Sequence, residues 1–121
     1  MVHNGIIENH DEIRGKLQAK GYEFVTETDT EVIAHLVERY RADGLATAVL
    51  RAARELQGAY AIACIAADAP DTLVALRRGS SPLVIGFGQG EMFVASDVPA
   101  FSTCPLANVR FSSANLYFAS T

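Results

Sequence analysis

Few side chains in this 121-residue sequence combine reactive chemistry with an informative position. The sequence contains two cysteines, Cys64 and Cys104, and either could in principle supply a thiol nucleophile. Cys64 lies in the middle of an apolar run, where burial raises a thiol pKa and leaves the group inert. Cys104 lies in a segment, residues 104–121, with neither a clear hydrophobic period nor a good helix cap. We therefore expect neither cysteine to act as a nucleophile.

The sequence does not indicate a metal or dinucleotide site either. Its histidines, His3, His10 and His35, are too far apart for the i, i+4 pair that binds a metal on one helix face. The two cysteines lack the spacing of a zinc site. The stretch GFGQGE departs from the G-x-G-x-x-G pattern and precedes a short strand rather than a helix. We expect a hairpin there, structural roles for the histidines, and no metal.

Two polar positions have competing interpretations. Asn4-Gly5 is the dipeptide typical of a tight turn between two strands, but only three residues precede it. Asp29 falls in the first turn of an expected helix, where a carboxylate stabilises the helix dipole by about 0.3–1 kcal/mol without any ligand. Taken singly, a hairpin turn and a helix-dipole interaction are the simpler interpretations of these residues.

Three helices are predicted in the first half of the chain. The first begins at a capping box formed by Asn9 and Glu12 and ends at Gly21. The second begins with the same pattern at residues 28–31, and the third covers about residues 45–56. In each helix the apolar residues recur at helical period, which predicts one face packed on a core.

Four strand patterns follow the helices. The first, AYAIACIAA at residues 59–67, is continuously apolar and is expected to be buried on both faces. Residues 72–77, 82–87 and 92–95 are the other predicted strands. Helices followed by strands, without alternation of the two, predict an α+β fold with a mainly antiparallel sheet.

Composition restricts the class of protein. Half of the residues are hydrophobic, a fifth are charged and the formal net charge is −4, which is typical of one globular domain. No basic stripe is present, so we expect no nucleic-acid partner. No apolar run approaches the roughly 20 residues that a membrane span requires. Two cysteines without a disulfide pattern are consistent with a reducing, cytoplasmic location.

Two stretches, HNGIIENH at residues 3–10 and TETDTEVIAHL at residues 26–36, resemble the glutaminase half of the glutamine–fructose-6-phosphate aminotransferase (glucosamine-6-phosphate synthase) family. GAYAIACI, DTLVALRRGSSPLVIGFGQGE and FVASDVPA are similar to the same family and occur in the same order. The resemblance covers about residues 2–101. Related glutamine amidotransferases share HNG, whereas HNGIIENH, ETDTEVIAHL and SPLVIG in series are specific to this branch.

The resemblance implies the αββα sandwich of the N-terminal-nucleophile hydrolases, in which an N-terminal cysteine attacks the side-chain amide of glutamine. It implies that Asn4, through its side-chain amide, and Gly5, through its backbone N–H, stabilise the oxyanion of the tetrahedral intermediate. It further implies that Asp29 binds the α-ammonium group of glutamine. No metal and no organic cofactor are implied in this half.

The sequence departs from the family pattern before HNG. The nucleophilic cysteine and a segment of Arg-Trp-Ala-Thr-His type precede HNG in the family, and these 121 residues contain neither. We therefore interpret residues 1–103 as a partial glutaminase domain with a partial αββα fold, inactive by itself. Residues 104–121 are interpreted as a poorly matching tail that need not be native.

The expected partners follow from the same resemblance. They are glutamine and, in the intact enzyme, a sugar-phosphate isomerase domain, with transfer of the amide nitrogen to fructose 6-phosphate to give glucosamine 6-phosphate. Open apolar sheet edges predict a homo-oligomer. Two alternatives remain: the glutaminase domain of another amidotransferase, such as one resembling amidophosphoribosyltransferase, and a non-catalytic association module.

Overall fold

The computed structural model describes residues 1–87, 91–95, 109–112 and 115–120. In chain order they form β1 (Val2–Gly5), α1 (His10–Ala19), α2 (Asp29–Arg39), the 3-10 turn η1 (Arg41–Asp43), α3 (Leu45–Glu55), β2 (Tyr60–Ala66), β3 (Ala69–Arg78), β4 (Val84–Phe87), β5 (Glu91–Ala95), β6 (Val109–Ser112) and β7 (Asn115–Ser120).

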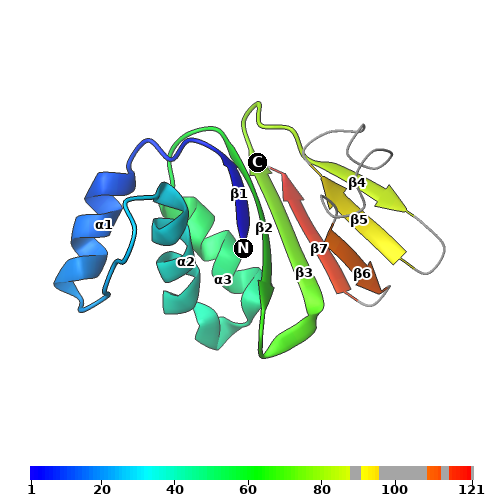
Figure 1. The fold of residues 1–121 in the computed structure, drawn as a ribbon, viewed down its shortest axis with the longest axis horizontal. Coiled ribbons are helices and arrows are strands. Elements are labelled where there is room, and N and C mark those ends of the chain that lie inside the picture. The colour runs from blue at the N-terminus through cyan, green and yellow to red at the C-terminus, as the bar shows by residue number, and fades with distance from the viewer. Residues whose placement is uncertain (88–90, 96–108, 113–114, 121) are drawn as a thin grey trace.

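The strands form two sheets, with the orders β1-β2-β3-β7 and β4-β5-β6 (Figure 1). Every pairing is antiparallel except that of β3 with β7. Figure 1 shows the three α-helices grouped on one side of the first sheet and the second sheet at the other end of the molecule. The α+β class with a mainly antiparallel sheet is therefore confirmed.

The first sheet is buried on both faces, as the apolar run of β2 predicted. Side chains alternate along a strand, and Ile62 of β2 with Leu76 of β3 belongs to the core beneath the helices. Ala63 of β2 and Ala75 of β3 contact Val94 of β5 in a smaller core on the opposite face. The layers are thus helices, first sheet and second sheet.

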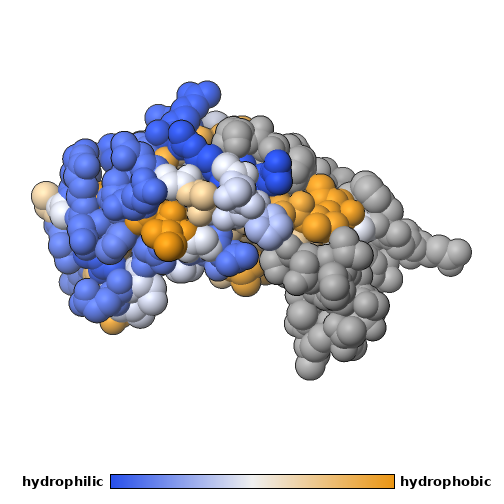
Figure 2. Space-filling model, turned by 90° about the horizontal axis from the view of Figure 1, so that it is seen from above, coloured by the Kyte–Doolittle hydropathy of each residue, from blue (hydrophilic) through white to orange (hydrophobic). Residues whose placement is uncertain are grey.

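The helical layer covers the core with a hydrophilic surface. In Figure 2 the helical part of the visible face is predominantly hydrophilic, and apolar residues reach it only in separate patches. Within the described residues, no helix has the length and apolar character needed to cross a bilayer.

The three helices agree with the predicted ones, but the prediction of a capping box at the start of α1 was wrong. The Asn9 side chain makes no cap hydrogen bond. Its Nδ2 donates to the backbone oxygen of Glu55 at 2.8 Å, and its Oδ1 accepts from the backbone N–H of Gln57 at 2.9 Å. Glu12 pairs with Lys16 instead of reaching back to Asn9. The long-range bonds replace the local cap because they satisfy backbone groups where α3 leads into β2.

The hairpin interpretation of Asn4-Gly5 was also wrong. Both residues belong to β1, which pairs antiparallel with β2 and places Asn4 opposite Ala61 and Gly5 opposite Tyr60. The chain then continues to α1 and does not fold back on β1. A partner strand so distant in sequence leaves no local signal, which is why the dipeptide alone was misleading.

The later strands contain one confirmed expectation and one unpredicted feature. β4 and β5 pair antiparallel, which confirms the hairpin around GFGQGE, although residues 88–90 lie outside the described residues. Two strands, β6 and β7, occur at residues 109–112 and 115–120, where the sequence had predicted none. β7 lies parallel to β3 and extends the first sheet.

Gly58 generates a test of this fold. Its φ is +124°, and a Cβ added there would lie 2.2 Å from the backbone oxygen of Ile6. We expect Gly58→Ala to lower the free energy of unfolding by more than about 2 kcal/mol, because both the dihedral angle and the contact are unfavourable. Urea unfolding followed by circular dichroism measures the change.

Gly15→Ala is the matched control. Gly15 is an exposed residue of α1, and a Cβ added there would meet no atom within 4 Å. This substitution is expected to stabilise by about 0.5–1 kcal/mol, because alanine is the better helix former. Equal effects at the two glycines would contradict the described approach of Gly58 to the backbone of Ile6.

Candidate functional site

The site predicted from the sequence begins on β1, at the edge of the first sheet. Ile6 donates its backbone N–H to the oxygen of Ala59 at 3.2 Å. Bonded and non-bonded residues alternate along an antiparallel ladder, so the N–H of Gly5 is directed away from β2, toward the outer edge. The side chain of Asn4 is exposed and has no hydrogen bond among the described residues. Both groups predicted to bind an oxyanion are therefore available to a ligand.

Gly5 is required by the fold as well as by the predicted chemistry. Its φ is +117°, and a Cβ added there would lie 2.3 Å from the Ala59 oxygen and 2.7 Å from the Tyr60 Cα. The Ser81 Oγ would lie 3.0 Å from the same Cβ. Because the strand pairing alone demands glycine at this position, a substitution of Gly5 cannot separate catalysis from folding.

Asp29, the other predicted site residue, lies against β1. It is the first residue of α2, and its Oδ2 accepts a hydrogen bond from the backbone N–H of Ile7 at 3.2 Å. Its Oδ1 is 3.6 Å from the Nδ1 of His3. These two neighbours lie on either side of Asn4-Gly5 in the chain, so Asp29 lies beside this part of β1, at its junction with α2. The side chain of Asn4 points to the face of the sheet opposite His3. The side chain of Asp29 is 26% exposed, which leaves it accessible to a ligand.

His3 is buried at this junction. Its side chain is only 3% exposed, and its Nδ1 is 3.1 Å from the hydroxyl oxygen of Thr30. Burial lowers the pKa of His3 below the ordinary 6.5, against an opposing effect of the Asp29 carboxylate. The lowered pKa favours the neutral imidazole at pH 7, which does not neutralise the Asp29 carboxylate.

The segment that leads into Asp29 is held by side chains from two helices. Glu31 of α2 accepts hydrogen bonds from the backbone N–H groups of Val25, at 2.8 Å, and Thr26, at 2.7 Å. Arg14 of α1 donates to the backbone oxygens of Thr26, at 2.8 Å, and Thr28, at 3.0 Å. These bonds fix the start of α2, and hence the position of Asp29, although the segment has no regular secondary structure.

The hydrogen bonds to Glu31 change its titration. They lower its pKa from 4.5 to about 2, with the Thr26 hydroxyl making the largest contribution, ahead of the backbone N–H of Val25. His35 lies on the same helix, with its Nε2 3.4 Å from Glu31 and its ring packed edge-on against Tyr22 and Phe24. We therefore assign His35 a structural role.

Cys64 fits the expectation of an inert thiol. It is buried in the core beneath the helices, and burial raises the pKa of its thiol. Cys104 lies outside the described residues. The described part of the chain also has no group of three or more histidine, cysteine, aspartate or glutamate side chains that could hold a metal ion.

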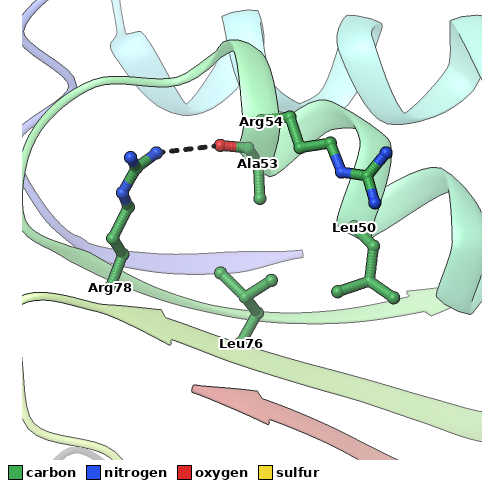
Figure 3. Close-up of a pocket in the computed structure, with 5 residues that line it drawn as sticks. All are labelled: Leu50, Ala53, Arg54, Leu76 and Arg78. Atoms are coloured by element: carbon green, nitrogen blue, oxygen red, sulfur yellow. Dashed lines mark hydrogen bonds between the residues drawn. The ribbon is translucent and has the colours of Figure 1, made fainter. Parts of the chain in front are cut away.

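A separate hollow of about 360 Å³ lies between α3 and β3. Figure 3 shows its lining, in which Arg78 donates to the backbone oxygen of Ala53 at 3.1 Å. The same guanidinium donates to the oxygen of Leu56 at 2.6 Å, so Arg78 satisfies carbonyls at the end of α3. The hollow contains none of the predicted site residues, and we do not assign the glutaminase chemistry to it.

Sequence reasoning missed the residues that support the site. Arg14 and Glu31 bind backbone groups of a segment without a periodic pattern, and nothing in the sequence indicated these contacts. Glu31 was expected to complete a local cap, but it reaches one turn further back, to residues 25 and 26. His3 was expected to have a structural role, but its contact with Thr30 was not predicted, because the two residues are far apart in the sequence.

The low pKa of Glu31 predicts an acid-dependent loss of stability. A carboxylate whose pKa is lower in the folded state stabilises the fold above its unfolded pKa, and this contribution is lost as the pH falls from about 4.5 to about 2. We expect Glu31→Gln to be less stable at pH 7 and to show a shallower decline of stability across that interval. Urea unfolding at a series of pH values gives the comparison.

Glu27→Gln is the control, since Glu27 lies beside the same segment in sequence and none of the hydrogen bonds described for Glu31 involves it. Its unfolding curves are expected to follow those of the unmodified chain. A Glu31→Gln variant with an unchanged pH dependence would show that these bonds do not form in solution.

Relatives of known identity match most of this chain. The glutamine–fructose-6-phosphate aminotransferase [isomerizing] of Bordetella pertussis is 57% identical over 102 residues, which are 84% of this chain and 17% of the relative. The enzyme of the same name from Escherichia coli is 59% identical over 99 residues, covering 80% and 16%. The chain thus spans about a sixth of the length of the curated relatives it matches.

Two solved structures have a similar fold. A structure described as the allosteric regulatory enzyme of purine biosynthesis has a TM-score of 0.75 and 28% identity, covering 94% of this chain and 24% of that one. Glutamine phosphoribosylpyrophosphate amidotransferase from B. subtilis has a TM-score of 0.65 and 21% identity, covering 93% and 28%, and supports the fold alone. These likenesses confirm the expected fold class.

The family assignment rests on a match that covers most of the chain. Residues 1–103 match the family described as glutamine amidotransferase domain. The match includes β1, the start of α2 and therefore all three predicted site residues. The chain belongs to the glutamine amidotransferase domain family.

Proposed function

We propose that these residues form the oxyanion-stabilising and ammonium-binding part of a glutaminase site. The whole enzyme would transfer the amide nitrogen of glutamine to fructose 6-phosphate and form glucosamine 6-phosphate. One observation carries the proposal: the Asp29 carboxylate contacts Ile7 and His3, which lie on either side of Asn4-Gly5 in the chain. A single small molecule at the open edge of β1 could therefore contact the Gly5 N–H, which is directed to that edge, and the Asp29 carboxylate together.

The groups at the junction suit the two charged parts of the reacting glutamine. Attack of a thiolate on the side-chain amide forms a carbon–sulfur bond and moves charge to the amide oxygen. The free amide of Asn4 and the N–H of Gly5 would meet that oxygen, and each such donor is worth about 2.7–4 kcal/mol in the transition state. Asp29 would bind the α-ammonium group. The buried thiol of Cys64 is not suited to the attack, so another cysteine must supply it.

The identity of the molecule that accepts the amide nitrogen is the part of the proposal that depends on the relatives. The relatives named as fructose-6-phosphate aminotransferases are 57% and 59% identical to this chain. The two solved structures with a similar fold are 28% and 21% identical. We therefore favour fructose 6-phosphate, bound by a separate sugar-phosphate isomerase domain, over a phosphoribosyl acceptor. We also place the enzyme in the cytoplasm, consistent with the unpaired, buried Cys64.

Glutamine binding tests the assignment of Asp29. The 121-residue chain is expected to bind glutamine weakly, and Asp29→Asn should abolish this binding because the amide cannot neutralise the ammonium group. Titration with glutamine, followed by chemical-shift changes at the amides of Gly5 and Ile7, measures the affinity. We also expect the chain alone to release no ammonia from glutamine.

Asp11→Asn is the matched control for the loss of a charge. Asp11 also lies in the first turn of a helix, α1, and its side chain is 88% exposed. Its substitution removes a similar interaction with a helix dipole and should leave glutamine binding unchanged. Binding that survives in Asp29→Asn would contradict the proposed role of Asp29, and binding absent from the unmodified chain would favour a non-catalytic association module.

Self-association is a second property that we infer. β1 is the edge strand of its sheet in the described structure, and Val2 and Ile6 are 58% and 69% exposed at that edge. Unpaired strand edges are templates for pairing with another chain. Sedimentation equilibrium should show a dimer or larger assembly that Val2→Lys weakens. A purely monomeric chain at high concentration would contradict this inference.

A further inference from the structure

We propose that His3 is a positioning residue for Asp29, and that it thereby contributes to selection of a substrate with an α-ammonium group. The neutral imidazole, with its proton on Nδ1, lies between Thr30 and Asp29 and fixes the direction of the carboxylate. This inference rests on the proposed role of Asp29 in glutamine binding.

The strand places His3 and Asn4 on opposite faces of the sheet. His3 is paired with Ile62, which belongs to the core beneath the helices, so the imidazole faces the start of α2. Asn4 follows directly and is paired with Ala61, whose side chain points to the other face. Two consecutive residues of β1 therefore have different tasks. His3 faces the Asp29 carboxylate, and Asn4, on the other face, is the residue predicted to bind the oxyanion.

The contacts of His3 determine the tautomer that we assign. An ionised carboxylate is an acceptor only, and an unprotonated Nδ1 would direct its lone pair at Asp29 from 3.6 Å. A proton on Nδ1 removes this repulsion and can be donated to the Thr30 hydroxyl at 3.1 Å. The Nε2 atom is buried and has no hydrogen-bond partner among the described residues. A second proton on Nε2 would therefore be unsatisfied, which favours the neutral ring.

A carboxylate held at two points keeps a defined direction. The N–H of Ile7 fixes Oδ2 of Asp29, but a single hydrogen bond leaves the group free to turn about it. The Nδ1–H of His3 is donated to Thr30 and makes no hydrogen bond to Asp29, but its positive end lies 3.6 Å from Oδ1 and opposes that rotation electrostatically. Two carboxylate oxygens offer about four acceptor positions, so positions remain for an ammonium group. Since the ring carries no charge, it orients Asp29 without competing with that ammonium.

Two substitutions of His3 test the proposal on the 121-residue chain. In His3→Asn the side-chain amide can place an N–H near the position of Nδ1, whereas His3→Leu fills the space without a donor. The ligands are glutamine and 4-carbamoylbutanoate, which is glutamine without its α-ammonium group. We expect His3→Leu to raise the Kd for glutamine by up to about fivefold, because the electrostatic contact with Oδ1 is lost, and to change the Kd for 4-carbamoylbutanoate less than about twofold. His3→Asn should restore the preference for glutamine.

The outcomes separate positioning from folding. Equal weakening of both ligands by His3→Leu would show a structural role only and would overturn the proposal, as would unchanged affinities. A chain that binds neither ligand contradicts the proposed function rather than the role of His3. In that case the tautomer decides: long-range ¹H–¹⁵N correlation should show Nδ1 protonated at pH 7, and a ring protonated on Nε2 would overturn the positioning role independently of any ligand.

Discussion

The pairing of β1 with β2 is the constraint on which the other features depend. It joins residues 2–5 to residues 60–63, and it is possible only because glycine occupies positions 5 and 58, where a Cβ would strike the opposing backbone. The same pairing leaves the outer edge of β1 open and directs the N–H of Gly5 toward it. It also places Ile7 and His3 where the first residue of α2 can contact them. The candidate site is therefore a direct product of one strand pairing.

The carboxylates of Asp29 and Glu31 are held in place mainly by uncharged groups. Asp29 accepts a hydrogen bond from a backbone N–H and lies close to an imidazole whose lowered pKa favours the neutral form, so neither of these two contacts supplies a full positive charge. The neighbouring Glu31 is in a different situation, because two backbone N–H groups and a hydroxyl use its acceptor positions. Two carboxylates in the same helical turn thus have different functions: one holds the chain in place, and the other remains available to a ligand.

Periodicity predicted the elements well where the pattern was long and local. The helical stripes and the apolar run of β2 gave the three helices and the doubly buried strand, because burial on one or two faces determines which positions are apolar. Contacts between segments far apart in the sequence were not predicted. Asn9 follows the pattern of a helix cap but binds residues 55 and 57, and Asn4-Gly5 follows the pattern of a turn but lies in a strand. The three site residues were identified only through the resemblance to a family, because each has a simple structural interpretation when taken alone.

Because β1 and β2 are far apart in the sequence, we expect β1 to join the first sheet late in folding. β2 and β3 are neighbours in the chain, and α3 directly precedes them, so these elements can form with short loops and little loss of chain entropy. β1 can join only after a much longer loop has closed. Its contacts also lie at the edge of the sheet, among the elements that open most easily in a folded protein. We therefore expect the junction of β1 with α2 to become ordered after α3, β2 and β3, and its amide hydrogens to exchange before those of β2 and β3.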